Sequence, residues 1–165
     1  MAFVAEDGTG LPNSNAYGDV SGADDYFADR GVETWADLGT AEKQIALIKA
    51  TDYIENRFNF LGSVYNDDQA LKFPRVYLDA SDPQMPANLL KAMYEYALRT
   101  LDGELAPDLE FDAKGLQVES KKEKVGPIEE STTYKTGASI LTLRPYPAAD
   151  MLLRDLIDTA RRVIR

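Results

Sequence analysis

Carboxylates are the only plentiful reactive groups in this sequence, because its 165 residues include no His and no Cys. Their absence excludes disulfides, Cys/His zinc sites, cysteine nucleophiles and a histidine general base. The closest acidic pairs are Asp67-Asp68 and Glu129-Glu130, with Asp25 and Asp29 four residues apart on an expected helix. A cation site needs several oxygens to converge, and no D-x-D-x-D-G loop is present. Since 28 acids produce such pairs by chance, we predict no catalytic residue, no metal site, no cofactor and no enzymatic activity.

Six aromatic residues cluster between residues 53 and 77 with three basic residues among them, a composition that could stack the bases of single-stranded DNA. Glu55, Asp67 and Asp68 cancel the three positive charges of this segment. The electrostatic contribution to nucleic-acid binding is then missing, which favours a core and a packed loop over a binding platform. The residues of this segment are Tyr53, Arg57, Phe58, Phe60, Tyr65, Lys72, Phe73, Arg75 and Tyr77.

Charge is distributed unevenly along the chain. The net charge is −10, and residues 1–40 alone hold eight acids and one base, a net of −7. Residues 154–165 reverse the sign, with four Arg against two Asp. Unlike ends could meet within a chain, between subunits or on a partner, although solubility and helix-dipole complementation explain any single charge. The overall acidity argues against a duplex-DNA binder, which needs a basic face.

Hydrophobic periodicity predicts a mainly α (α+β) fold. Apolar spacings of three and four indicate helices at 22–30, 40–57, 86–102 and 147–164, with Ser21 and Thr40 as N-caps of the first two and a connection around Trp35 between them. Alternation indicates strands near 115–125 and 127–135, and residues 59–84 are expected to form a long ordered loop. We therefore predict a small bundle of about four helices with a β-hairpin or long-strand insertion and extended N- and C-terminal arms. The expected parts are an arm (1–20), a helical core (21–113), a β-hairpin region (114–146) and a C-terminal docking helix (147–165).

No targeting or membrane segment is expected. The N-terminal MAFVAEDGTG has no basic region and no apolar run, which is unlike a secretory signal. No stretch approaches about 18 consecutive apolar residues, so we expect no contact with a membrane.

Several motifs, taken in order, resemble a known family. They are EDGTGLPNSNAY, SGADDYFADRG with Trp35, EKQIALIKATDYIENRF, Gln69 to Arg75 with its F-P-R, MPANLLKAMYEYALRTL, and KKEKVGPIE. In this order they resemble tailed-phage neck proteins, the head–tail connectors or adaptors, some of which are labelled DnaT-like single-stranded-DNA-binding proteins. The resemblance covers about residues 5–130.

The resemblance implies a structural adaptor of a bacteriophage neck. Its copies would form a ring, expected to be 12-fold, that links the portal to the next neck or tail protein, a stopper or tail terminator. Genome DNA would pass through without specific binding, and the protein would lie in the virion, or in the host cytoplasm during assembly. The implied portal interface is Leu153, Leu156, Ile157, Arg161, Arg162 and Arg165. The implied interface with a neighbour or the next ring is Val118, Lys121, Lys122, Lys124, Val125 and Ile128.

Two other functions remain open at this point. The alternative is a single-stranded-DNA-binding or primosomal-type protein, which a titration with DNA at low salt would distinguish. The third is a carboxylate metalloenzyme such as a nuclease. The C-terminal helix also has two possible positions, since its apolar stripe could pack on its own domain or lie in the groove of a partner.

Overall fold

Two compact units make up the protein. Residues 1–105 and 145–165 form the first, here called the helical unit, and residues 106–144 form the second, the hairpin unit. The hairpin unit is therefore an insertion in the sequence of the helical unit. The structure, a computed structural model, describes residues 2–77, 82–107, 118–124, 129–134 and 144–158, with the backbone alone for 118–124 and 129–134.

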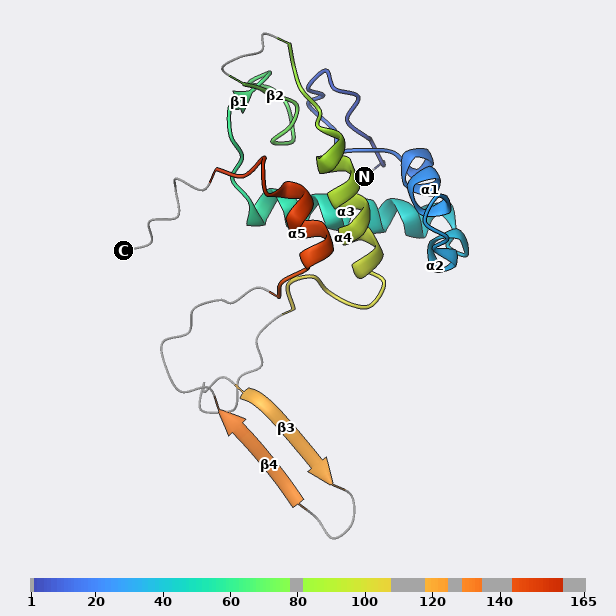
Figure 1. Cartoon of the computed structure of the whole chain (residues 1–165), viewed down its shortest axis with the longest axis vertical. Helices are drawn as coiled ribbons and strands as arrows, with labels where there is room; N and C mark the ends of the chain where they lie inside the picture. The colour runs from blue at the N-terminus through green and yellow to red at the C-terminus, as the bar shows by residue number, and fades with distance from the viewer. Residues whose placement is uncertain (1, 78–81, 108–117, 125–128, 135–143, 159–165) are drawn as a thin grey trace, which may run out of the picture. The chain divides into compact units, whose positions relative to one another are not determined.

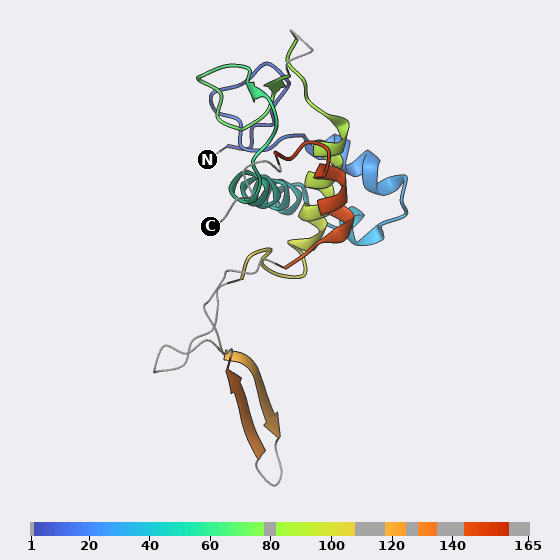
Figure 2. The same ribbon diagram turned by 60° about the vertical axis from the view of Figure 1, so that its left-hand side comes forward.

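Three helices pack together at the centre of the helical unit. α4 (Ala87–Arg99) lies against both α3 (Thr40–Arg57) and α5 (Pro147–Leu153), as two views show (Figure 1, Figure 2). Their contact is made by apolar side chains at spacings of three and four. Each fully buried large side chain contributes about 1.5–3 kcal/mol, so the packed stripes rather than helix propensity hold these helices. The residues with no exposed surface include Leu47, Ala50, Ile54, Leu89, Met93, Ala97 and Leu153.

The two long helices lie where the sequence predicts them. α3 has Gly39 as its N-cap, and the Gly39 backbone N–H donates to Glu42 Oε2 at 2.8 Å. The expected cap, Thr40, is instead the first helical residue. α4 follows Pro86 and ends three residues earlier than expected, because Thr100 and Leu101 donate to the last carbonyls of the helix in a tight turn.

Two short helices form one end of the helical unit. α1 (Val20–Ala28) begins after Asp19, whose carboxylate accepts from the Gly22 backbone N–H at 2.8 Å, so the cap lies two residues before the expected Ser21. α2 (Glu33–Ala36) replaces a predicted connection. It forms because Trp35 is buried beside Phe27, with its indole N–H donating to Asp24.

α5 is much shorter than the predicted helix 147–164. After Leu153 the chain turns back onto the loop that follows α3. There Leu61 N donates to Leu156 O at 3.0 Å and Asp158 N donates to Asn59 O at 2.9 Å. Ile157 forms an isolated antiparallel bridge with Phe60. Residues 154–156 end the helix in a turn, with Leu156 N donating to Leu153 O at 2.9 Å, and residues 156–158 then pair with the loop. Leu156 and Ile157 therefore pack on their own unit.

Small β-structures complete the two units. In the helical unit, β1 (Ser63–Val64) and β2 (Arg75–Val76) form a short antiparallel ladder within the predicted long loop. In the hairpin unit, β3 (Val118–Lys124) pairs antiparallel with β4 (Glu129–Tyr134), with an irregularity between Val118 and Ser120. The predicted mainly α fold with a β-hairpin is therefore confirmed. None of the helices in the described part of the chain is long and apolar enough to cross a membrane.

Candidate functional site

Arg75, the arginine of the F-P-R motif, organises the loop between α3 and α4. Its side chain is 9% exposed and all its hydrogen bonds in the described structure go to backbone carbonyls. Nε donates to Leu61 O at 2.6 Å and Nη1 to Lys72 O at 3.1 Å, while Nη2 donates to Phe60 O at 3.3 Å and also to Gly62 O. Arg75 is thus a structural cation that fixes four carbonyls of an irregular segment.

Lys72, a second cation of the 53–77 segment, also bonds to groups of the protein itself. Lys72 Nζ donates to Phe58 O at 2.7 Å and to Glu55 O, and the Lys72 N–H donates to Glu55 Oε1 at 2.9 Å. The same carboxylate accepts from the hydroxyl of the buried Tyr17. Burial, reinforced by the charge of Glu55, raises the pKa of Tyr17 well above its usual value.

Three of the six aromatic residues of that segment, Tyr53, Phe60 and Phe73, are buried in the core, and Phe58 and Tyr77 pack against it, as the sequence favoured. Phe73 is fully buried and in edge contact with Phe60 and Tyr17, and Tyr53 lies against Tyr96 and Tyr146. Tyr65 is the exception, because 46% of it is exposed. The segment is therefore a packed loop that presents one aromatic ring.

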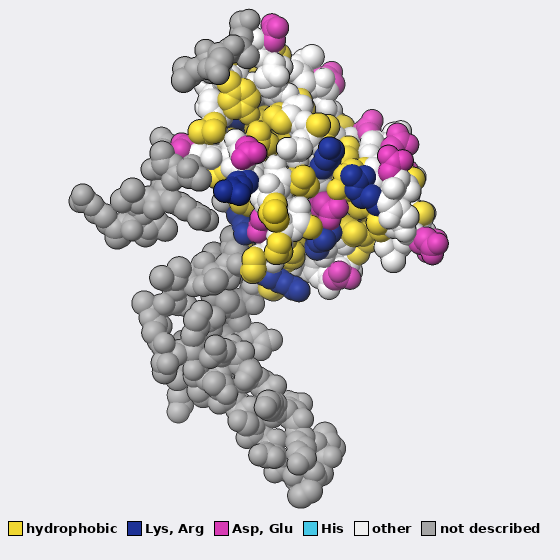
Figure 3. Space-filling model, viewed as in Figure 1, with side chains coloured by type: hydrophobic (Ala, Val, Ile, Leu, Met, Phe, Trp, Pro, Cys, Tyr) yellow, Lys and Arg dark blue, Asp and Glu magenta, His cyan; other side chains and the backbone are white. Residues whose placement is uncertain are grey.

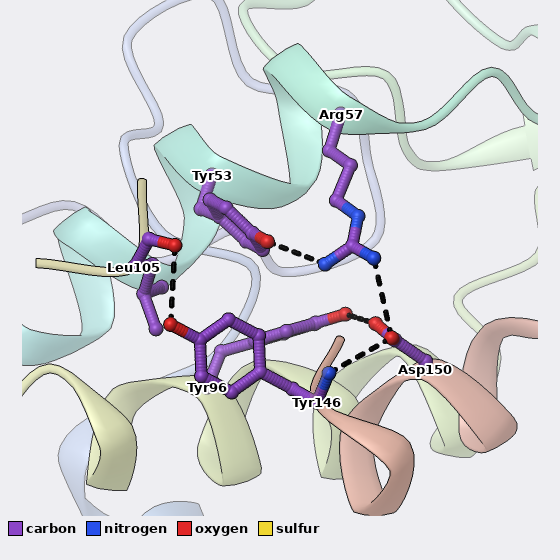
Figure 4. A network of polar contacts seen from close by, with 6 residues as sticks. All are labelled: Tyr53, Arg57, Tyr96, Leu105, Tyr146 and Asp150. Atoms are coloured by element: carbon purple, nitrogen blue, oxygen red, sulfur yellow. Dashed lines mark hydrogen bonds and ion pairs between the residues drawn. The ribbon is translucent and has the colours of Figure 1, made fainter. Parts of the chain in front are cut away.

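A polar network ties α3, α4 and α5 together (Figure 4). Asp150 of α5 pairs with Arg57 Nη2 at 3.2 Å and accepts from the Tyr96 hydroxyl and, at 3.0 Å, from the Tyr146 N–H. Arg57 also donates to the Tyr53 hydroxyl. Burial and the hydrogen bond to the Asp150 carboxylate raise the pKa of Tyr96. Asp150 and Arg57 are thus paired with each other, which is typical of an ion pair that stabilises the packing of helices.

The same network also connects the two chain segments on either side of the insertion 106–144. The Tyr146 hydroxyl donates to Leu105 O at 3.1 Å (Figure 4), and Leu105 and Tyr146 are 6% and 8% exposed. Leu105 directly precedes the insertion 106–144, and Tyr146 is the second residue after it. The helical unit therefore holds both ends of the insertion by its own contacts.

The N-terminal motif EDGTGLPNSNAY is explained by Glu6. This carboxylate is 7% exposed and accepts from the backbone N–H groups of Gly8, Gly10 and Leu11 at 3.1, 2.8 and 3.0 Å. The hydroxyl of Ser14 adds a fourth bond at 3.0 Å. The motif builds a carboxylate-centred loop, so its backbone donors are already used and do not form an anion site.

The acidic pairs do not form a metal centre in the described part of the chain. Asp25 and Asp29 are both exposed on or beside α1, and Asp67 and Asp68 lie in an exposed turn. Within the described residues no group of three or more carboxylates could hold a metal ion. The metalloenzyme alternative therefore has no observation in its favour.

Surface charge differs between the ends of the helical unit. Acidic side chains gather over α1 and α2, whereas Lys and Arg side chains are interspersed with hydrophobic ones over α4 and α5 (Figure 3). Of the described cations, Lys49, Lys91 and Arg154 make no ion pair or side-chain hydrogen bond with any described residue. The hairpin unit differs again in composition, with six bases and seven acids in residues 106–144, a net of −1. The remaining residues of the chain carry a net of −9.

The structure describes three of the six predicted interface residues of the C-terminus. Leu153 is fully buried in the core and cannot present its side chain to a partner. Leu156 and Ile157 are partly buried and pack against that core. The predicted residues Arg161, Arg162 and Arg165 lie outside the described residues.

The predicted interface residues of the hairpin fall partly on described backbone. Val118, Lys121, Lys122 and Lys124 are residues of β3, and Val125 and Ile128 lie outside the described residues. No observation of the structure tests these residues as an interface, and the division into four parts at residues 20, 113 and 146 stays a prediction.

Comparison with known proteins identifies a family for the whole chain. The model of the family described as "Putative DnaT-like ssDNA binding protein" matches residues 1–165. The search of curated proteins and the search of solved structures found no match.

This match overturns the head–tail adaptor assignment. The portal, the neighbouring adaptor subunits of a 12-fold ring and the next neck or tail protein were wrong as partners, and so was the passage of DNA without specific binding. Some of the neck proteins that the sequence resembles are labelled DnaT-like single-stranded-DNA-binding proteins, and this label is the description of the matched family. The expected location in the virion stays a prediction that no observation tests.

Proposed function

We propose that this chain, which belongs to the DnaT-like family whose model spans residues 1–165, binds single-stranded DNA. The family match carries the proposal, because it extends over both units. We propose a binding role without catalysis; no carboxylate cluster of the described residues suggests a metal-dependent reaction. A primosomal role stays a prediction.

The charge distribution favours the hairpin unit as the place where phosphates are held. Phosphate contacts by Lys and Arg supply most of the affinity of non-specific nucleic-acid binding. The helical unit, at −9, repels a phosphate chain overall, whereas residues 114–124 hold four Lys and two Glu, a net of +2. The average charge of the chain therefore conceals a short cationic stretch on and just before β3.

The register of the hairpin supports this assignment. Two of the three lysines of β3 lie opposite hydroxyl residues and not opposite carboxylates, so their charge is not cancelled by the residue directly across the ladder. Hydroxyl groups also hydrogen-bond to phosphate oxygens. The pairs are Lys121 with Thr132, Lys122 with Ser131 and Lys124 with Glu129.

A salt-dependent titration tests the proposal. Full-length protein is titrated into a fluorescent oligonucleotide of unpaired, mixed sequence at several salt concentrations, beginning at low ionic strength. We expect binding that weakens steeply with salt, at a slope of about 0.7 in log–log units for each phosphate contacted. Absence of binding at the lowest ionic strength would contradict the proposed function.

A lysine variant tests the location. The triple substitution Lys121→Ala, Lys122→Ala and Lys124→Ala should weaken binding and reduce the salt slope by about 2. The matched control is Lys49→Ala, because Lys49 is exposed on α3 and has no ion pair or side-chain hydrogen bond within the described residues. An equal change in salt slope and binding free energy per lysine removed in the two variants would show that the lysines act only through total charge.

A further inference from the structure

Tyr65 presents an aromatic ring that the fold does not need for its core. It is 46% exposed, and all other large hydrophobic side chains that the described structure exposes to a similar degree are aliphatic. Two of them, Leu61 at 44% and Val64 at 41%, lie within the same five residues. We call Leu61, Val64 and Tyr65 the β1 patch, and Figure 3 shows hydrophobic side chains at the surface in the region of β1 and β2.

The backbone beneath the β1 patch is held in one conformation. The Tyr65 N–H donates to Pro74 O at 3.2 Å and to Gln69 Oε1 at 3.1 Å. Gly62 has φ +76°, and a Cβ there would meet Val76 O at 2.4 Å, so only glycine fits. An exposed ring on a fixed backbone loses little conformational entropy when it binds a flat partner.

The charges around the β1 patch are arranged asymmetrically. On the Leu61 side, the guanidinium of Arg75 is bound to the carbonyls of Leu61 and Gly62 and to no carboxylate of the described residues. A partly desolvated cation paired only with carbonyl dipoles keeps a positive potential at the nearby surface. On the other side, Asp67 and Asp68 are exposed in the turn that follows Tyr65. An anionic partner is therefore favoured on the side of Leu61 and opposed on the side of the turn.

We propose that Tyr65 stacks on an unpaired base of the bound strand. The inference rests on the proposed function and adds to it a reason to prefer single strands, since a base within a duplex has no free face. Aromatic stacking tolerates every base, because each has a π-face. The potential at Leu61 places the phosphate chain on that side of the ring.

Two substitutions at Tyr65 test the stacking. Tyr65→Ala should weaken binding of an unpaired oligonucleotide about tenfold, the scale of one base–aromatic stack, with an unchanged salt slope because no charge is removed. Tyr65→Phe keeps the ring and should bind like the unaltered protein. Leu101→Ala is the control, because Leu101 is 40% exposed and lies just after α4, in another part of the unit. Thermal unfolding of each variant reports whether the fold is intact.

An abasic oligonucleotide supplies the decisive comparison. If Tyr65 stacks on a base, the unaltered protein should bind the abasic strand about tenfold more weakly than the normal strand, whereas Tyr65→Ala should bind both strands with similar affinity. If Tyr65→Ala binds the normal strand as tightly as the unaltered protein, the inference is wrong and the proposed function stands. If the unaltered protein binds neither strand at low salt, the proposed function itself fails.

Discussion

Asp150 is the residue at which the contacts of three helices converge, so its charge should matter for stability. Asp150→Asn removes the ion pair with Arg57 and weakens the bonds from Tyr96 and the Tyr146 N–H. A partly buried guanidinium then loses its counter-charge, and we expect the free energy of unfolding in urea to fall by about 2 kcal/mol. The control is Asp155→Asn at an exposed neighbouring position, expected within about 0.5 kcal/mol of the unaltered protein. Equal effects of the two substitutions would contradict the structural role of the network.

Tyr94 gives a second test at the scale of the residue, through pH. Burial, with smaller contributions from the charges of Asp19 and Asp25, raises the pKa of Tyr94 to about 12. An unfolded tyrosine ionises near pH 10, so between about pH 10 and 12 the folded state holds a proton that the unfolded state releases. Stability is therefore fully present below pH 10 and is lost as the pH rises through that range.

The Tyr94→Phe variant should reduce this loss. It removes one titrating group, so its free energy of unfolding should decline less steeply between pH 10 and 12 than that of the unaltered protein, when both are measured by urea titration. Burial also raises the pKa of Tyr17 and Tyr96, so part of the decline remains in the variant. Identical slopes for the two proteins would show that Tyr94 ionises as freely in the folded state as in the unfolded state.

At the scale of the element, the local sequence predicts a helix correctly where its hydrophobic pattern spans several turns. α3 and α4 each carry an apolar stripe over several turns, and the packing of these stripes decides the structure. The short elements depend on single tertiary contacts. α2 exists because Trp35 is buried beside Phe27, and α1 begins at Asp19 because that carboxylate accepts from Gly22 N. Periodicity carries no signal for either contact.

The end of α5 shows a tertiary contact that overrides a helical pattern. Leu156 and Ile157 continue the stripe of Leu153, and the pattern alone predicts helix to residue 164. Leu61 N instead donates to Leu156 O and Asp158 N donates to Asn59 O, so that Ile157 pairs with Phe60 of a loop nearly a hundred residues earlier. A local sequence pattern cannot predict such a pairing, because nothing in either segment identifies the other as its partner. The same contacts decide that this segment packs on its own unit.

At the scale of the whole molecule, average charge says little about where a nucleic acid could bind. A net charge of −10 argues against a duplex-DNA binder, and the aromatic 53–77 segment has no net positive charge, but neither fact describes the separate parts of the chain. In the structure, Arg57, Lys72 and Arg75 of that segment bond to groups of the protein itself, so that segment offers an exposed aromatic ring but no basic side chain for direct phosphate contacts. The division into units separates a helical unit at −9 from an insertion near neutrality, and sequence alone does not show where that boundary lies.

The insertion permits a test of how folding and binding are divided between the two units. The Tyr146 hydroxyl donates to Leu105 O, so the two ends of the helical unit meet without residues 106–144. Replacing these residues by a linker of about six Gly and Ser residues should leave the helical unit folded, with cooperative thermal unfolding and unchanged helical circular dichroism. Binding of single-stranded DNA should fall at least as far as in the triple lysine variant, because every hairpin lysine is gone.

Tyr146→Phe, combined with the same replacement, tests whether the hydrogen bond from the Tyr146 hydroxyl to Leu105 O stabilises the shortened helical unit. The ring contacts with Tyr53 and Tyr96 remain, while the bond to Leu105 is lost, so the double change should lower the unfolding temperature of the shortened protein without preventing folding. A shortened protein that fails to fold would show that the insertion stabilises the helical unit. One that folds and binds single strands as tightly as the full chain would move the phosphate contacts to the helical unit. Lys91 and Arg154, which make no ion pair with any described residue, would then be the next residues to substitute.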